Sequence, residues 1–275
     1  FGSMNVSIRQ HSQPLISGLV LLLAYLPALL WMWDRWFARD SYYTHGILVP
    51  FVTGYLIWQQ REELSQLPVK RSAWGMVLIV GGILLYLFSS LFRVYFSSGF
   101  SLLIVLMGLV LHYYGVAVFR KILFPLFFLI FMMPLPLVVI INISFQIKLF
   151  AAEIAAGILN GMGVWALQEG SIIKMRHAYV IVDDMCSGLR SLITLTAMGS
   201  IFAYWLKGPM YKRVLLFLTA IPIAIVTNVC RVVILSLISE IWGAERSSGL
   251  VHDITGFLVL VLAFIFLYIT ARILE

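Results

Sequence analysis

Residues 250–271 read LVHDITGFLVLVLAFIFLYITA, a long apolar stretch after a short polar start. A helix needs about 20 mostly apolar residues to cross the hydrocarbon core of a bilayer, so this stretch predicts a membrane span. Seven further stretches before it fit the same description: residues 14–33, 42–58, 73–92, 99–116, 122–140, 187–206 and 214–237. The sequence therefore predicts an all-α polytopic membrane protein with about eight transmembrane helices.

The composition points to the lipid bilayer in the same way. Of the 275 residues, 62% are hydrophobic and 11% are charged, whereas soluble domains carry about 25% charged residues. This excludes a soluble globule, and a disordered chain needs the opposite composition. The net charge of +7 comes without a basic stripe interleaved with aromatic residues, so nucleic-acid binding is not expected. We expect one integral membrane domain over residues 4–275, with residues 1–3 an expression scar.

Positive charges in the short loops set the expected orientation, because cytoplasmic loops carry an excess of Lys and Arg. With the amino terminus in the cytoplasm, the inner segments carry ten Lys and Arg residues and the short outer loops carry four. We therefore expect both termini in the cytoplasm. The fifth span is expected to kink near Pro134 and Pro136, and the seventh at Pro222.

The connection between the fifth and sixth spans, residues 142–184, is expected to lie outside the membrane. Its first part, 142–160, has apolar residues near helical spacing interrupted by polar ones, which predicts a helix lying on the membrane surface. Its second part, 164–184, alternates β-branched or aromatic residues with polar ones and is broken after residue 169 and near residue 176. This predicts a β-meander of two or three strands, and strand edges are surfaces on which proteins capture extended peptides.

Polar residues within spans are costly, and here they gather in three stretches, residues 183–191, 227–231 and 252–256. The first leads into the sixth span, the second lies in the seventh, and the third opens the eighth. The expected topology places all three at the same outer face. Three such clusters at one depth rarely coincide by chance, so we interpret this face as a functional site.

Cys186 is the candidate nucleophile of this site. It is expected at the start of the sixth span, where free N–H groups and the helix dipole favour a thiolate. Arg190, four residues later, lies on the same helix face and favours the same charge. Asp183 and Asp184 precede the cysteine and are taken as supporting residues. The alternative is that Cys186 is a small apolar filler, as cysteines in membrane helices often are.

Arg231 is expected to have the highest free-energy cost of membrane insertion in the chain, because it lies one to two turns inside the expected outer boundary. Its planar fork of donors suits the stabilisation of an oxyanion, and Asn228 shares its helix face. The alternatives are snorkelling towards lipid headgroups or pairing with Glu240 or an aspartate. Cys230 points away from this face, and the sequence leaves open whether it forms a disulfide with Cys186.

His252 is the candidate proton shuttle, since it is expected near the first turn of the last span at the same depth as the thiol and the arginine. A lone interfacial histidine is more often a surface residue, which is the competing interpretation. His45 is also expected at the outer face, as a residue bordering the site. The sequence contains no metal-ligand pattern, so neither a metal nor a cofactor is expected.

The three clusters together resemble the exosortase/archaeosortase family. The residues that carry the resemblance are MCSGLRS at 185–191, NVCR at 228–231 and HDITG at 252–256, in this order on consecutive spans. The segments THG at 44–46 and MPLP at 133–136 are similar to the family as well. The resemblance covers the chain from about residue 41 to its end.

This resemblance implies a cysteine transpeptidase of the bacterial inner membrane. Such enzymes are thought to recognise a C-terminal sorting signal, which comprises a short motif of the Pro-Glu-Pro type, an apolar helix and a basic tail. They are thought to cut near the motif and to pass the new carboxyl end to an acceptor, which the sequence does not identify. The proposed catalytic Cys, Arg and His of the family fall on Cys186, Arg231 and His252.

Two other functions fit the same sequence. A transporter or channel would use Arg231 and His252 to line a pathway, but such proteins usually show inverted repeats and polar residues at the midplane. A non-catalytic component of polysaccharide export or envelope assembly would leave the cysteine motif without a role. Trapping a covalent peptide adduct on Cys186 separates the enzyme from both.

Overall fold

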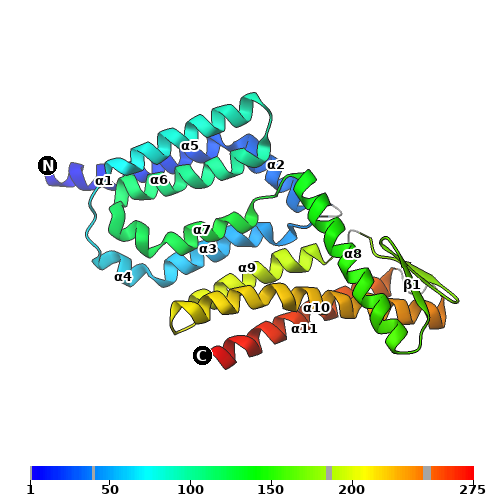
Figure 1. Ribbon diagram of the computed structural model, residues 1–275. Helices are drawn as coiled ribbons and strands as arrows, with labels where there is room; N and C mark the ends of the chain where they lie inside the picture. Colours follow the sequence, from blue (N-terminus) through cyan, green and yellow to red (C-terminus); the bar gives the residue numbers. More distant parts are fainter. Residues whose placement is uncertain (1, 39–40, 184–187, 244–248) are drawn as a thin grey trace. The chain divides into compact units, whose positions relative to one another are not determined.

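The computed structural model describes residues 2–38, 41–183, 188–243 and 249–275 (Figure 1). Cys186 and Asp184 lie outside these residues. The chain divides into two compact units, Phe1–Leu135 and Pro136–Glu275. That the chain forms a single membrane domain stays a prediction.

The regular elements of the first unit are all helices in its described residues. Its longest helices, α5 (Ala73–Leu91) and α6 (Tyr95–Lys121), form a tightly packed hairpin. Gly75 and Gly108 lie where the two backbones meet, since a Cβ on Gly75 would come within 2.4 Å of the His112 nitrogen. The other elements are α1 (Gly2–Ala24), α2 (Leu26–Trp36), η1 (Thr44–Ile47), α3 (Leu48–Gln59), α4 (Arg61–Gln66), α7 (Leu123–Phe128) and η2 (Leu129–Met132).

The second unit is built around one long helix, α10 (Met210–Trp242), which continues through Pro222. On one side α10 packs with α9 (Leu189–Trp205) and α11 (Leu250–Leu274) around buried leucines and alanines. On another it packs with α8 (Leu137–Gly161) and the sheet, around an alanine-rich stretch of α8. Helix α10 therefore contacts α8, α9, α11 and the sheet.

The predicted meander is confirmed as a three-stranded antiparallel sheet with the strand order β1-β2-β3. The strands are β1 (Ala166–Glu169), β2 (Ile172–Met175) and β3 (Tyr179–Ile181). The register pairs Leu167 with Lys174 and Ile173 with Val180. The two breaks fall where the sequence places them, because Gly170 takes a positive φ of 61° in the first turn and residues 176–178 form the second.

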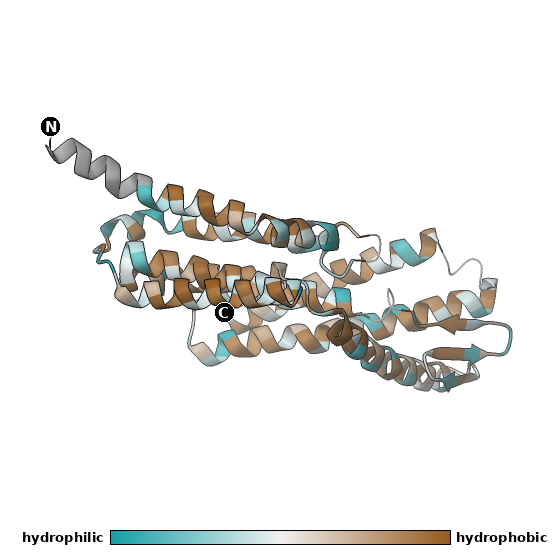
Figure 2. Ribbon diagram, turned by 90° about the horizontal axis from the view of Figure 1, so that it is seen from above, coloured by the Kyte–Doolittle hydropathy of each residue, from teal (hydrophilic) through white to brown (hydrophobic). Residues whose placement is uncertain are grey.

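Five helices are long and apolar enough to cross a membrane, or six if the bent pair Gln13–Ala24 and Leu26–Trp36 counts as one span; this covers the described residues. Figure 2 shows hydrophobic residues along most of the length of the long helices. The chain is thus a multi-pass membrane protein, while the expected number of about eight spans is not confirmed. Of the other expected spans, the second corresponds to a 12-residue α3 and the sixth to a 17-residue α9.

The region of the fifth expected span is where structure and expectation differ most. Instead of one kinked span over 122–140, two short helical segments end at Met132, and α8 starts after Pro136. Proline lacks an N–H and disfavours helix at the residue before it, so the helix restarts only at Leu137. The expected surface helix of 142–160 is part of this 25-residue α8, whose length and composition also suit a span; its surface position stays a prediction.

Candidate active site

Helices α10 and α11 bring two of the candidate residues into direct contact. The Arg231 Nη2 atom lies 3.0 Å from the Nε2 atom of His252 and donates to the His252 carbonyl oxygen at 3.1 Å. Arg231 is only 8% exposed, and the His252 side chain is 18% exposed. The two residues that the sequence selected on different spans therefore form one buried pair.

The Arg231 guanidinium lies against the His252 ring. Its Nη2 atom is 3.0 Å from Nε2 and 3.5 Å from Nδ1, so it contacts both ring nitrogens rather than one alone. On the Nδ1 side, Asp253 Oδ1 lies 3.3 Å away. A carboxylate only accepts hydrogen bonds, so Asp253 can accept a hydrogen bond from a proton that the ring carries on Nδ1.

The absence of a side chain at Gly256 leaves room for the Arg231 guanidinium. A Cβ added to Gly256 would lie 2.9 Å from Arg231 Nη2 and 3.1 Å from Cζ, so any larger residue would displace the guanidinium. One turn earlier on α11, the His252 carbonyl also accepts the Thr255 hydroxyl at 2.9 Å. The atoms that lie against Gly256 therefore belong to the side chain of Arg231.

The start of α9 lies against the same face of α10. Gly188 caps α9 with a left-handed backbone, φ +81°, and a Cβ there would come within 2.7 Å of Asn228 Cγ. Asn228 is 2% exposed and precedes Arg231 by about one helical turn. Because Gly188 follows Cys186 by two residues in the sequence, the described end of the cysteine motif reaches Asn228.

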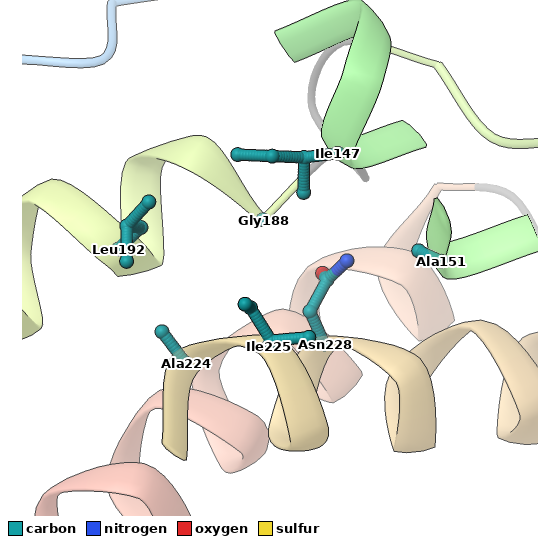
Figure 3. A pocket seen from close by; sticks show the side chains of 7 residues that line it. All are labelled: Ile147, Ala151, Gly188, Leu192, Ala224, Ile225 and Asn228. Carbon is teal, nitrogen blue, oxygen red and sulfur yellow. The ribbon is translucent and has the colours of Figure 1, made fainter. Parts of the chain in front are cut away.

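A small pocket opens beside this contact (Figure 3), and Asn228 supplies a polar group to an otherwise apolar lining. The lining residues come from α8, from the start of α9 and from α10: Ile147, Ala151, Gly188, Leu192, Ala224, Ile225 and Asn228. Arg190 is half-buried in the first turn of α9, and Asp183 is exposed after β3. In the described part of the chain, no cluster of three His, Cys, Asp or Glu side chains is placed to hold a metal ion.

His45 belongs to the first unit, so its expected place at the border of this site stays a prediction. It follows Tyr43, whose ring lies 6.1 Å from the His45 ring. The Leu135 N–H donates to the Tyr43 hydroxyl at 3.2 Å. The Trp36 indole donates to the Met132 carbonyl at 2.9 Å and packs on Gly46. The segment 44–46 and residues 133–135 of the second segment, which resemble the same family, therefore lie near each other within this unit.

Two contacts were not predicted from the sequence. Asp253 was seen only as part of a motif, although its position next to His252 in the first turn of a helix was a usable signal. Glu240 accepts the backbone N–H of His177 at 3.1 Å and contacts its Nδ1 at 2.8 Å, which ties the β2–β3 turn to the end of α10. These residues are 63 positions apart, and no local sequence pattern predicts their contact.

A family model described as transmembrane exosortase matches residues 33–269 of this chain. The matched range includes the cysteine motif, Asn228, Arg231, His252 and Gly256. No curated protein and no solved structure matches the chain.

Proposed function

The chain belongs to the transmembrane exosortase family, and we propose that it is a membrane-embedded cysteine peptidase and transpeptidase. Its substrates are exported proteins with a C-terminal sorting signal, which it cleaves through a thioester and transfers to an acceptor. The observation that carries this proposal is the buried contact between Arg231 and His252, beside the helix face that Gly188 of the cysteine motif reaches. Buried charges in a membrane protein mark functional sites.

The first half of the proposed reaction forms the thioester. His252 Nε2 takes the proton of the Cys186 thiol, and the sulfur attacks the carbonyl carbon of the scissile peptide. Arg231, with the help of Asn228, stabilises the negative oxygen of the tetrahedral intermediate. The carbon–nitrogen bond then breaks, and His252 returns its proton to the leaving amine.

The second half releases the product. His252 removes a proton from the incoming nucleophile, which attacks the thioester carbonyl and expels the Cys186 sulfur. Water as the nucleophile gives a protease, and an amine gives a transpeptidase. In the proposed reaction Asp253 accepts a hydrogen bond from the Nδ1 proton of His252, and Arg190 favours the thiolate.

The proposed cellular location also rests on membership of the exosortase family. We assign the chain to the bacterial inner membrane, with both termini in the cytoplasm and the site at the extracytoplasmic face. The excess of Lys and Arg in the inner loops supports this orientation. The apolar helix of the sorting signal docks among the spans, while its motif lies against the sheet.

The test is cleavage of a membrane-anchored reporter with such a signal by membranes that contain the full chain. Cys186→Ala is expected to abolish cleavage, and Cys230→Ala is the matched control, because Cys230 is exposed on α10. A thiol-reactive peptide should give a mass-shifted adduct on Cys186 in the wild type and in Cys230→Ala. Normal cleavage by Cys186→Ala would disprove the proposal.

A further inference from the structure

The two outer edges of the small sheet are not equivalent. The Met175 N–H donates to the Ala178 carbonyl and the Val182 N–H donates to the Ser171 carbonyl, at 2.9 and 2.8 Å. In an antiparallel ladder, hydrogen-bonded pairs alternate with pairs whose backbone groups point outwards. With this register, Tyr179 and Ile181 direct their N–H and C=O groups away from β2. The same alternation turns Ala166 and Gln168 outwards on β1.

The β1 edge is closed at Ala166 by a side chain of α8. The Asn160 amide donates to the Ala166 carbonyl at 2.7 Å, and its oxygen accepts the Ala166 N–H at 3.0 Å. The Gln168 side chain also reaches back to the Leu149 carbonyl of α8 at 3.1 Å. An added strand would have to break these contacts, so this edge is protected in the way that native sheets protect their edges.

The β3 edge has no such cover among the described residues. The outward backbone groups of Tyr179 and Ile181 have no hydrogen-bond partner there, and their side chains are 59% and 52% exposed. The strand is nevertheless held firmly, because Glu240 fixes the turn before it and Val182 continues its pairing after it. An edge that is fixed but unpaired is a template for an extended chain.

We propose that β3 binds the substrate by strand addition, with the backbone of Tyr179 and Ile181 pairing with an extended peptide segment beside the scissile bond. This rests on the proposed function and specifies how that site holds its substrate. The argument for this occupant is continuity, since β3 runs through Val182 and Asp183 directly into the cysteine motif.

The first test changes one donor on the enzyme. Ile181→Pro removes the outward N–H without touching the bonds between β2 and β3, and proline is tolerated where the N–H of an edge strand faces outwards. Cleavage of the reporter is expected to fall about three- to tenfold, as for one lost hydrogen bond. Ile181→Val keeps the N–H and is expected to cleave normally. Equal cleavage by the two variants would overturn the proposal.

The second test does not depend on the folding of a variant. Reporter peptides carry a single N-methyl group at successive backbone amides on both sides of the scissile bond. Strand addition predicts that methylation at alternate positions lowers cleavage about tenfold, while the intervening positions are neutral. An effect without this alternation would overturn strand addition.

The two proposals fail in different ways. If Cys186→Ala still cleaves the reporter, the proposed chemistry is wrong whatever the edge does. If cleavage requires Cys186 but the N-methyl series shows no alternation, the chemistry stands and strand addition at β3 is wrong. Labelling of Cys186 by a small thiol reagent in Ile181→Pro confirms that the variant keeps its nucleophile.

Discussion

The two units of the chain use buried polar groups in different ways. In the first, a neutral aromatic donor binds a buried backbone carbonyl, as Trp36 does at Met132. In the second, ionisable side chains hold the structure, with Arg231 8% exposed and the Glu240 side chain 12% exposed. A hydrogen bond from a neutral donor satisfies a buried backbone carbonyl at little free-energy cost, whereas a buried charge is costly unless it is paired. Arg231 and His252 both belong to the second unit, so the proposed chemistry is assigned to that unit.

After the loss of Cys186, the largest effect is expected at Arg231. Arg231→Ala should lower reporter cleavage about 10²–10³-fold, the range seen when an oxyanion donor is removed. Arg231→Lys should recover only part of this loss, because it keeps the charge but not the planar fork. The measurement is the initial rate at saturating reporter. Wild-type activity in Arg231→Lys would mean that charge alone is needed.

A smaller effect is expected from moving the arginine without replacing it. Gly256→Ala puts a methyl group against the guanidinium and should lower the cleavage rate about tenfold, because small displacements in an active site are costly. Gly157→Ala on α8 is the matched control, since a Cβ there has no atom within 4 Å. If the two variants are equally active, the position of Arg231 does not limit the reaction.

A further pair of variants separates backbone strain from the contact with Asn228. Gly188 and Gly163 have nearly equal φ angles, +81° and +84°, but a Cβ at Gly163 has no atom within 4 Å. Both changes to Ala should destabilise the protein by about 1–2 kcal/mol through the left-handed backbone. Gly188→Ala should lose at least about 1 kcal/mol more and some activity, because it displaces Asn228. Denaturant unfolding in detergent measures the difference, and equal losses would count against a tight contact.

The smallest effect on activity is expected in the first unit. Trp36→Phe leaves the Met132 carbonyl without its donor and should destabilise the protein by about 1–3 kcal/mol, while the cleavage rate changes less than about threefold. Trp74→Phe serves as the control, because Trp74 is 72% exposed. A loss of rate as large as that of Gly256→Ala would show that the first unit also shapes the site.

Local patterns allowed a good part of this structure to be predicted. The alternation within 164–184 and its two turns predicted the sheet, because strand period and turn chemistry depend on neighbouring residues. The long apolar runs likewise predicted α5, α6, α10 and α11 near their observed bounds. Arg231 and His252 were selected by the cost of polar groups in lipid, and the structure joins them.

What the sequence did not reveal depends on residues far apart in the chain. Hydropathy alone predicts one span across Pro134 and Pro136. In the structure the helical segments end before these prolines, and α8 begins after them. The tie between His177 and Glu240, and the closure of the β1 edge by Asn160, join elements that no periodicity relates. Cys186 lies outside the described residues, so its role stays a prediction from the motif.

Helix α10 is longer than a membrane span requires. Its 33 residues make a rod of about 50 Å, at about 1.5 Å per residue, which exceeds the roughly 30 Å hydrocarbon core. Measured from Met210, Arg231 stands about 32 Å along this rod, and Glu240, which holds the β2–β3 turn, stands farther along it. If α10 enters the hydrocarbon core at Met210, the proposed proton transfer lies near the outer boundary of the core and the proposed peptide binding lies beyond it.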